Sequence, residues 1–447
     1  MHRILLLLLA LPCLLGAQES RPLDPGAATI TTQRVKDAIS FLASDELMGR
    51  DSPSPGLEQA AAYLAARFTK AGLVPPGQGK DLFHRYTLEG LRLDPAALEV
   101  AVHAADGTVT KLEPGRDVRY LRASGAFASE AGEVESLTLD EFLGQRRQRG
   151  AVRARKPILV QVPADSLFWK NAEAAKDVLG RGGRGEAPIL LVRAGVLPDG
   201  AIRAAVRIPE PATVSIALTN VVGVLPGTTR QDEIVLVSAH YDHVGVQAPV
   251  NGDAIYNGAD DDATGTTAVL LLAEAFSQRK ERLPRTLAFV CFSAEEKGLR
   301  GSRAFAGAPP FPLAQVAVNL NLEMLGRPEA GKERKAWVTG RKLSDFESIL
   351  QPALARAGVD VLEFPMERML FSASDNYSFA SKGVVAHSIS AGTLHADYHQ
   401  PGDEVDKLDL EHMTAVISGI YEGVVEFATR AAKPAYNEQG KKAIAGR

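Results

Sequence analysis

Cysteine is scarce in the sequence, and long runs of one charge are absent. Only Cys13 and Cys291 occur in 447 residues. Cys13 lies in an apolar leader that we expect to be removed, and Cys291 lies in the apolar run RTLAFVCFS, so no intramolecular disulfide is expected. A formal net charge of −4 without a long basic stretch disfavours nucleic acid as a partner.

Two common catalytic patterns are also missing. Neither HExxH, the paired-histidine helix of one class of zinc protease, nor GxSxG, the nucleophile turn of many serine hydrolases, occurs in the sequence. Their absence disfavours both enzyme classes. The chain is 45% hydrophobic and 23% charged, which supports a large core and one or two domains.

The first 17 residues have the pattern of a secretory signal peptide. A basic start and the apolar run Ile4–Leu11 are followed by small residues up to Ala17. Lipid attachment at Cys13 is the alternative, and Pro12 disfavours it because a small residue is wanted there. The apolar run is too short for a permanent membrane anchor. We therefore expect a secreted or periplasmic protein.

The remaining sequence changes character twice. Short apolar runs alternate with glycine, proline and charge from Leu93 to Pro211, whereas strand and helix patterns alternate from Asn220 onward. The second pattern predicts a three-layer α/β/α sandwich with a largely parallel central sheet. The predicted divisions are a signal peptide (1–17), an amino-terminal part of the catalytic domain (18–92), a β-rich insertion (93–215), the catalytic domain (216–432) and a disordered tail (433–447).

One glycine-rich stretch requires comment. GRGGRG at 180–185 fits the dinucleotide pattern GxGxxG. It follows a predicted helix and precedes a strand, which is the reverse of the order that the phosphate-binding turn needs. We interpret it as a surface loop.

Residue types that bind metals recur at the ends of the predicted strands. They are His240 and Asp242, then Asp260, Asp261 and Asp262, then Glu295 and Glu296, then Glu323, and beyond them His395 and His399. Each alone fits a structural role, such as a helix cap or a solvated glutamate. Together they fit two zinc ions that share a bridging carboxylate, each ion with one imidazole and one further carboxylate. A nearby carboxylate free of metal could then act as a general base.

The motifs that contain these residues resemble those of a known family. SAHYDHVG, NGADDDATG, SAEEKGLRGS, NLEMLG and DYHQPGDEVD are similar to the metal motifs of the secreted two-zinc exopeptidases. That family includes bacterial leucine aminopeptidases, aminopeptidase Y and the glutamate carboxypeptidases. The resemblance covers about residues 32–92 and 216–432, and residues 93–215 loosely resemble the protease-associated domain that some members carry.

This resemblance implies a role for individual residues. It implies Glu295 as the general base, Asp242 as the residue that orients a ligand imidazole, and Tyr398 as a possible oxyanion donor. It also implies that two zinc ions are bound by His240, Asp261, Glu296, Glu323 and His399. Asp261 is the implied ligand that bridges the two ions.

Three positions depart from the family pattern or lie outside it. Glu323 stands where many members have aspartate and is one methylene longer, which leaves the geometry of its metal site less certain. His243 and His395 are further imidazoles outside the motif positions, and we expect them to be supporting or loop residues.

The resemblance implies a secreted zinc-dependent exopeptidase acting on peptides, with an aminopeptidase as the first choice. A carboxypeptidase or dipeptidase of the same family is the first alternative. A single-zinc glutaminyl cyclase is disfavoured by the full ligand set. A non-catalytic binding protein on this scaffold is also disfavoured, because it would be expected to have lost ligands or the base.

Overall fold

A mixed β-sheet forms the centre of the larger part of the molecule. The computed structural model describes residues 22–123, 125–149, 154–174, 177–178, 186–198 and 202–445; the predicted signal peptide and the stretch at 180–185 lie outside these residues. Nine strands of the described chain form the sheet, in the order β18 (Asp360–Val361), β17 (Lys335–Val338), β19 (Ala386–Ser390), β16 (Val316–Leu322), β12 (Arg230–His240), β15 (Arg285–Phe292), β11 (Ala212–Leu225), β1 (Phe83–Arg92) and β8 (Asp177–Val178).

The four central strands, β19, β16, β12 and β15, run parallel to one another. Every residue of β15 and of β16 is buried. Their continuous apolar sequences are explained by this position, because a parallel strand covered on both faces has no solvent side. The strands from β11 outward are antiparallel to their neighbours.

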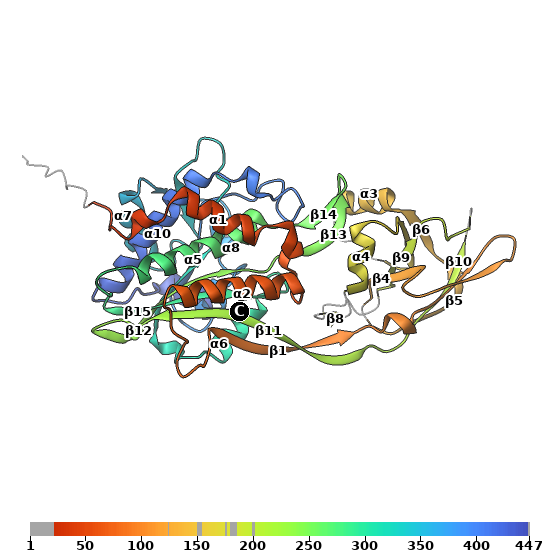
Figure 1. Cartoon of the computed structure of the whole chain (residues 1–447), viewed down its shortest axis with the longest axis horizontal. Helices are drawn as coiled ribbons and strands as arrows, with labels where there is room; N and C mark the ends of the chain where they lie inside the picture. The colour runs from red at the N-terminus through yellow and green to blue at the C-terminus, as the bar shows by residue number, and fades with distance from the viewer. Residues whose placement is uncertain are drawn as a thin grey trace, which may run out of the picture.

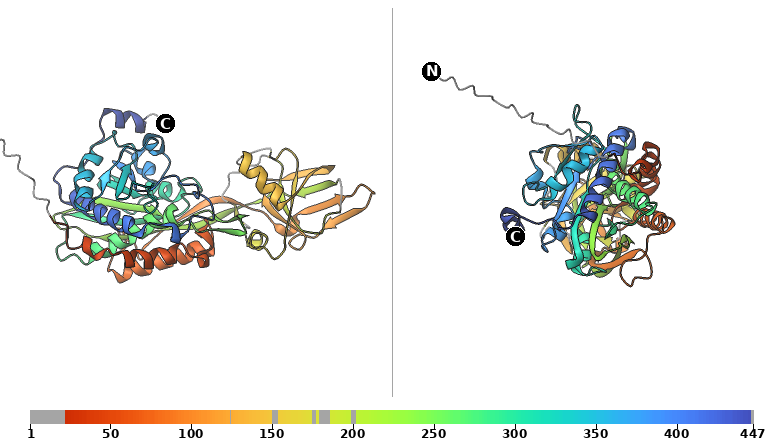
Figure 2. Two further views of the ribbon diagram at one scale, coloured as in Figure 1. Left: turned by 90° about the horizontal axis from the view of Figure 1, so that it is seen from above. Right: turned by 90° about the vertical axis from the view of Figure 1, so that its left-hand side faces the viewer.

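Helices cover both faces of this sheet. On one face α1 (Thr32–Leu42), α2 (Pro55–Lys70), α5 (Gly265–Ser277) and α10 (Leu410–Thr429) pack together (Figure 1; Figure 2, left). Helix α7 (Phe346–Arg356) packs against α10 on this same face, whereas α6 (Arg300–Gly307) contacts α9 (Asn376–Ala380) on the other face. This arrangement confirms the predicted α/β/α sandwich. Within the described residues, no helix has both the length and the apolar character needed to cross a bilayer.

A smaller β-rich lobe extends from one end of this body (Figure 1). It is joined to the central sheet by β1 and β11, which pair continuously from Phe83 opposite Val221 to Arg92 opposite Ala212. Helices α3 (Leu139–Arg149) and α4 (Leu167–Ala174) pack against strands of this lobe. One sheet contains β3 (Val109–Leu112), β2 (Glu99–His103), β10 (Arg203–Ile208) and β5 (Phe127–Glu133), and the other contains β4 (Val118–Arg122), β9 (Ile189–Arg193), β7 (Ile158–Val162) and β6 (Glu135–Thr138).

A hairpin from the larger body also reaches this lobe. Strands β13 (Gly245–Val250) and β14 (Asp253–Tyr256) pair with each other only. Ala248 of β13 is 1% exposed and belongs to the same hydrophobic cluster as Phe168 and Trp169 of α4. The hairpin therefore links the segment after His240 to the core of the lobe.

The carboxyl-terminal tail, predicted to be disordered, is ordered through residue 445. Tyr436 is buried, and its hydroxyl accepts a hydrogen bond from the amide of Ala386 at 3.1 Å. Helix α11 (Glu438–Ala445) follows, and the Asn437 side chain accepts hydrogen bonds from two of its first amides. The prediction was wrong because it followed the polar composition of the segment. It gave no weight to Tyr436, which packs into the core, or to Asn437, which caps the helix.

A buried histidine in β19 makes stability depend on pH. Nδ1 of His387 donates to the carbonyl of Thr339 at 2.7 Å, and burial lowers its pKa to about 4. The imidazole of His387 is therefore protonated near pH 6.5 in the unfolded chain but only near pH 4 in the folded chain. The free energy of unfolding consequently decreases as the pH falls from 6.5 toward 4. Relative to His387→Asn, we expect the wild type to lose about 2 kcal/mol more between pH 7 and pH 5. Urea unfolding at both pH values measures this, and equal losses in the two proteins would contradict it.

Candidate metal centre

Three successive aspartates lie between β14 and α5, and the fold uses them differently. Asp260 accepts a hydrogen bond from the amide of Gly326 at 2.7 Å. Asp262 accepts from the amides of Gly265 at 2.9 Å and Met324 at 3.1 Å, which ties the start of α5 to the end of β16. Asp261 is left to face two groups of imidazoles and carboxylates.

The first group consists of His240, Asp261 and Glu323, whose potential ligand atoms lie within 4.8 Å of one another. Nε2 of His240 is 3.3 Å from Oδ1 of Asp261 and 3.2 Å from Oε1 of Glu323. Burial alone would lower the pKa of His240, but Glu323 and Glu295 raise it well above its ordinary value. The structure thus brings together the three residues that the sequence assigns to one zinc ion.

The orientation of His240 is fixed by Asp242 through the main-chain carbonyl of that residue. Nδ1 of His240 lies 3.1 Å from the main-chain carbonyl of Asp242, which leaves Nε2 facing the cluster. The Asp242 carboxylate is 3.7 Å from Nδ1 and instead accepts a hydrogen bond from the amide of Glu295 at 3.0 Å. Asp242 therefore positions both an imidazole and the loop that carries the predicted base.

The longer side chain of Glu323 is held in place by a hydroxyl. Oγ of Ser374 donates to Oε2 of Glu323 at 2.5 Å and accepts from the side-chain amide of Asn321 at 2.9 Å. This hydrogen bond leaves Oε1 for the group around His240. A glutamate at this position is therefore compatible with a well-defined site.

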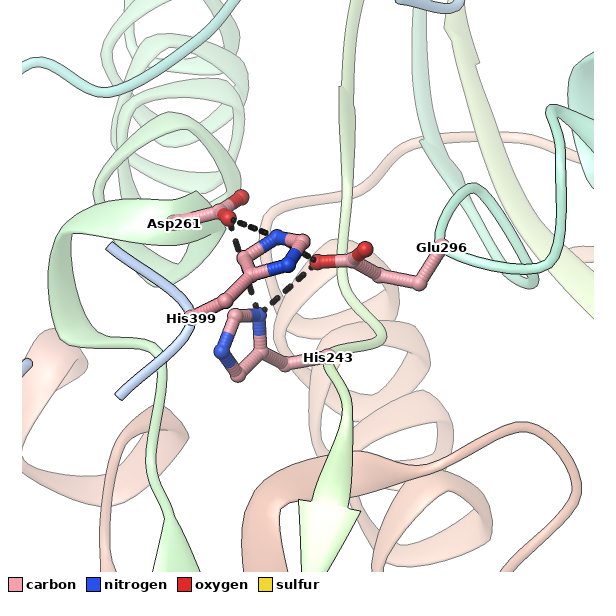
Figure 3. A group of neighbouring side chains, drawn as sticks. All are labelled: His243, Asp261, Glu296 and His399. Carbon is pink, nitrogen blue, oxygen red and sulfur yellow. Dashed lines mark ion pairs between the residues drawn. The ribbon is translucent and has the colours of Figure 1, made fainter. Parts of the chain in front are cut away.

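The second group consists of His243, Asp261, Glu296 and His399 (Figure 3). Nε2 of His399 is 2.9 Å from Oδ2 of Asp261 and 3.0 Å from Oε1 of Glu296. Nδ1 of His243 is also 3.0 Å from Oε1 of Glu296. The structure brings the three predicted residues together and adds His243, which its off-motif position did not indicate. His395 stays outside both groups, 3.3 Å from Oδ2 of Asp260.

The two adjacent glutamates have opposite environments. Burial and the neighbouring Glu296, Asp375 and Glu323 carboxylates raise the pKa of Glu295 well above its usual range, against the pull of His240. For Glu296, burial and Asp261 act in the same upward direction, but His243 and His399 outweigh them and lower its pKa to about 2. A carboxyl that holds a proton readily suits a general base, and a permanently ionised one suits a metal ligand.

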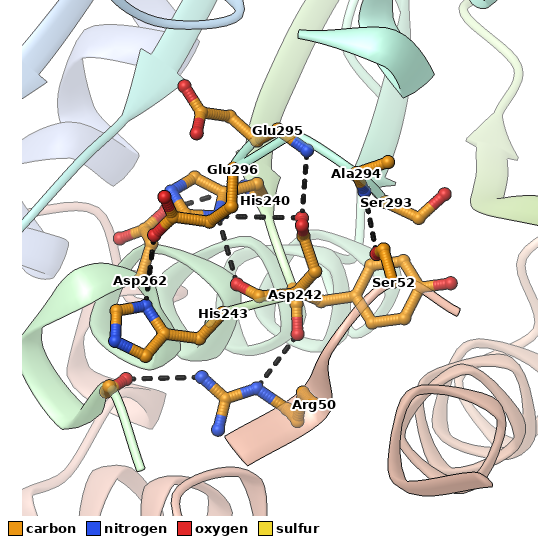
Figure 4. A network of polar contacts seen from close by, with 12 residues as sticks. Arg50, Ser52, His240, Asp242, His243, Asp262, Ser293, Ala294, Glu295 and Glu296 are labelled. Atoms are coloured by element: carbon orange, nitrogen blue, oxygen red, sulfur yellow. Dashed lines mark hydrogen bonds and ion pairs between the residues drawn. The ribbon is translucent and has the colours of Figure 1, made fainter. Parts of the chain in front are cut away.

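Arg50 is a central residue of the site that the sequence did not reveal. It is fully buried and lies close to Asp242 and His243 (Figure 4). Its guanidinium donates to the carbonyls of Tyr241 at 2.8 Å, Asn257 at 2.7 Å and Gly258 at 3.1 Å, and to that of Leu42. Burial lowers its pKa to about 10, so it stays charged at neutral pH. It therefore fixes the segments on either side of the β13–β14 hairpin and places a positive charge behind the acidic groups.

Asp403 was also missed, although it lies in the motif DYHQPGDEVD that contains His399. Its carboxylate accepts from the amide of Asp260 at 3.0 Å and from the amide of Asp261 at 3.1 Å. These bonds hold the backbone of Asp261, the residue that the two groups share. Its position four residues after His399 was the available signal.

A cavity of about 80 Å³ opens beside the first group. The predicted residues Glu295 and Tyr398 lie on its wall, with Glu296, His240, Asp261 and Glu323. Tyr398 is 38% exposed, and partial burial together with the site's carboxylates raises its pKa, so its hydroxyl keeps its proton. The rest of the wall is formed by Met324, Trp337, Thr339, Leu370, Ala373, Ser374, Ser388, Ser390, Thr393 and Leu394.

The donor atoms fit zinc. Imidazole nitrogens and carboxylate oxygens are common zinc ligands, and several buried atoms here have no hydrogen-bond partner within the described chain: Oδ2 of Asp261, Oε1 of Glu296 and Nε2 of His399. A metal ion would satisfy all three. The two groups lie at the strand ends of an α/β sheet with a parallel centre, and each has the residue types that can hold a metal ion.

Residues 220–424, which are somewhat less than half of the chain, match the profile of Peptidase family M28. Leucine aminopeptidase 1 of Coccidioides posadasii is 25% identical over 237 residues, covering 50% of this chain and 58% of that protein. A probable zinc metalloprotease of Pyrenophora teres f. teres is 32% identical over 115 residues, covering 26% of this chain. That match spans only 24% of the fungal protein, about a quarter of its length.

Solved structures share the fold. A zinc aminopeptidase from Bacillus subtilis superposes with a TM-score of 0.58 at 18% identity, covering 90% of this chain and 96% of that one. An aminopeptidase from Aneurinibacillus sp. strain AM-1 gives 0.55 at 18% identity, with 91% and 96% covered. At this identity the likeness establishes the architecture, and the roles of individual residues have to come from the geometry of this chain.

Proposed function

We propose that the chain is a zinc-dependent aminopeptidase that binds two zinc ions. The observation that carries the proposal is the pair of ligand groups that share Asp261. Asp261 would bridge one ion held by His240 and Glu323 and another held by Glu296 and His399. Zinc in such a site polarises a carbonyl and makes water more acidic.

The protein groups around the metals divide the remaining work. Glu295 lies on the cavity wall with a raised pKa, so it accepts the proton of the attacking water and returns it to the leaving amine. Tyr398, on the same wall, donates a hydrogen bond to the carbonyl oxygen as negative charge develops there. Asp242 positions His240 through its main-chain carbonyl and Glu295 through its carboxylate.

The cavity wall supports an aminopeptidase over a carboxypeptidase. Recognition of a terminal carboxylate uses a cation, commonly arginine. Among the described residues that line the cavity there is no lysine or arginine, whereas carboxylates of the site face it and suit a terminal ammonium group. The side chains of Met324, Trp337, Leu370 and Leu394 offer an apolar surface to the first side chain of the peptide.

Two measurements test this proposal: the metal content of the protein, and whether it cleaves peptides from the amino or the carboxyl terminus. We expect purified protein to contain about two zinc ions per chain and to release leucine from an aminoacyl reporter. His399→Ala should lower the zinc content, because it removes a ligand. Elemental analysis that finds no stoichiometric divalent metal, or cleavage only of a carboxy-terminal reporter, would refute the proposal. We further propose export through residues 1–17, for which amino-terminal sequencing of the exported chain should give Gln18.

A further inference from the structure

His243 has no role in the proposed reaction, yet it lies in the second ligand group. We propose that His243 is a fourth protein ligand of the zinc held by Glu296 and His399. The inference rests on the proposed binding of zinc. It makes the two metal positions unequal, one enclosed by four protein ligands and the other held by three.

The distances fit a single tetrahedral ion. Nδ1 of His243 is 3.0 Å from Oε1 of Glu296 and 3.8 Å from Oδ2 of Asp261. Ligand atoms about 2.0–2.1 Å from a tetrahedral zinc lie about 3.3–3.4 Å from one another. Together with the 2.9 Å and 3.0 Å separations of Nε2 of His399 from the same two oxygens, these values bracket that spacing.

Well-aligned hydrogen bonds do not account for this convergence, although the imidazole nitrogens and carboxylate oxygens lie within ion-pair distance of one another. His243 is 0% exposed, and neither of its ring nitrogens has a hydrogen-bond partner among the described residues. Oε1 of Glu296, Nε2 of His399 and Oδ2 of Asp261 share this property. Buried polar atoms are nearly always satisfied, so four such atoms directed at one point indicate a ligand between them (Figure 3).

The surrounding backbone holds the imidazole in this position. The amide of His243 donates to the carbonyl of Arg50 at 3.2 Å. Gly258, with φ of 57°, lies against the ring so closely that a Cβ there would be 2.4 Å from Cγ of His243. The glycine allows the left-handed backbone and also leaves room for the ring. The side chain is therefore preorganised for binding.

The two positions also differ in their relation to the cavity. All three residues of the His240 group line it, whereas only Asp261 and Glu296 of the second group do, and His243 and His399 are absent from its described lining. Closed four-ligand zinc sites are typical of structural metals, and sites with three protein ligands keep a position for water or substrate. We infer that the Glu296 site binds zinc more tightly and that the His240 site is the one that substrate reaches.

Chelator competition on the chain from residue 18 tests this inference. We expect the wild type to release one zinc ion easily and to retain the other. Loss of an outer-shell partner of a metal ligand costs about 10–100-fold in affinity, so His243→Ala should weaken the tight site by more than about 100-fold. His395→Ala is the matched control, since it removes another imidazole, whose side chain is 9% exposed, that lies beside an aspartate but outside both groups, and it should leave both affinities unchanged.

A second variant reports coordination directly. His243→Cys loaded with cobalt should show a thiolate-to-cobalt charge-transfer band that is absent from the wild type, whose Cys291 is buried in β15. Retention of the tight site in His243→Ala together with no band in His243→Cys would overturn the inference; if the alanine variant fails to fold, the cobalt spectrum decides alone. A wild type that binds zinc and releases leucine while both variants keep the tight site would defeat this inference and leave the proposed function standing. A wild type without zinc would defeat both.

Discussion

Glu295→Gln is expected to slow peptide hydrolysis by roughly 10²–10⁴-fold while both zinc ions stay bound. The side chain lies on the cavity wall, and burial and nearby carboxylates raise its pKa, so it is suited to exchange protons. The amide of glutamine has nearly the same shape but cannot accept the proton. Turnover of a leucyl reporter and zinc content, measured on the same preparation, give the result.

Glu296→Gln is the matched control, since it makes the same chemical change one residue away. Glu296 lies 3.0 Å from both His243 and His399 and is held ionised by them. A neutral amide is a poorer zinc donor, so this variant should lose metal from one site. Near-normal turnover in Glu295→Gln, or loss of metal from it alone, would show that the roles of the two glutamates have been assigned wrongly.

Arg50→Met is expected to reduce the free energy of unfolding by roughly 3–5 kcal/mol, the usual cost of removing one partner of a buried charge group. The guanidinium serves four backbone carbonyls, and methionine would leave them without a donor. Because three of those carbonyls, of Tyr241, Asn257 and Gly258, belong to the segments that carry His240 and Asp261, zinc affinity should also fall by about 10–100-fold. Urea unfolding and chelator competition measure the two effects.

Arg285→Met is the control that separates an effect on zinc binding from a general loss of stability. Arg285 is also buried, and it donates to the carbonyls of Phe427 and Arg430 at 2.7 Å at the end of α10, away from the ligand segments. We expect a similar loss of stability without a change in zinc affinity. If Arg50→Met also retained wild-type zinc affinity, its role would be structural only.

The sequence could predict the part of this protein that depends on local pattern. Continuous apolar runs identified β12, β15 and β16, and ligand residue types at their ends could be expected to meet at one edge of the sheet. The choice of Asp261 among three aspartates came from the motif resemblance. The hydrogen bonds of Asp260 and Asp262 supply the physical reason, since both are used to fix the backbone.

What escaped prediction depends on contacts between distant segments. Ser374 lies 51 residues from the Glu323 that it positions, and Arg50 lies 191 residues from the carbonyl of Tyr241. Neither belongs to a residue type or spacing that indicates metal chemistry. His243 was underestimated for a different reason, because its role follows from the approach of Glu296, and a linear pattern contains no distances.

The β13–β14 hairpin has a consequence for how the molecule comes apart. It starts two residues after His243, ends directly before Asn257, and its Ala248 is enclosed by the core of the β-rich lobe. Melting of the lobe would release this hairpin and loosen both of its roots, which Arg50 binds. By thermodynamic linkage, a metal ion that stabilises the two segments at the ends of the hairpin also stabilises the lobe. Removal of the metal with a chelator should therefore increase proteolysis and hydrogen exchange in the lobe, although the lobe is distant from the metal site. We therefore expect the lobe and the larger body to unfold together, and the excised lobe to be less stable than the lobe in the intact chain.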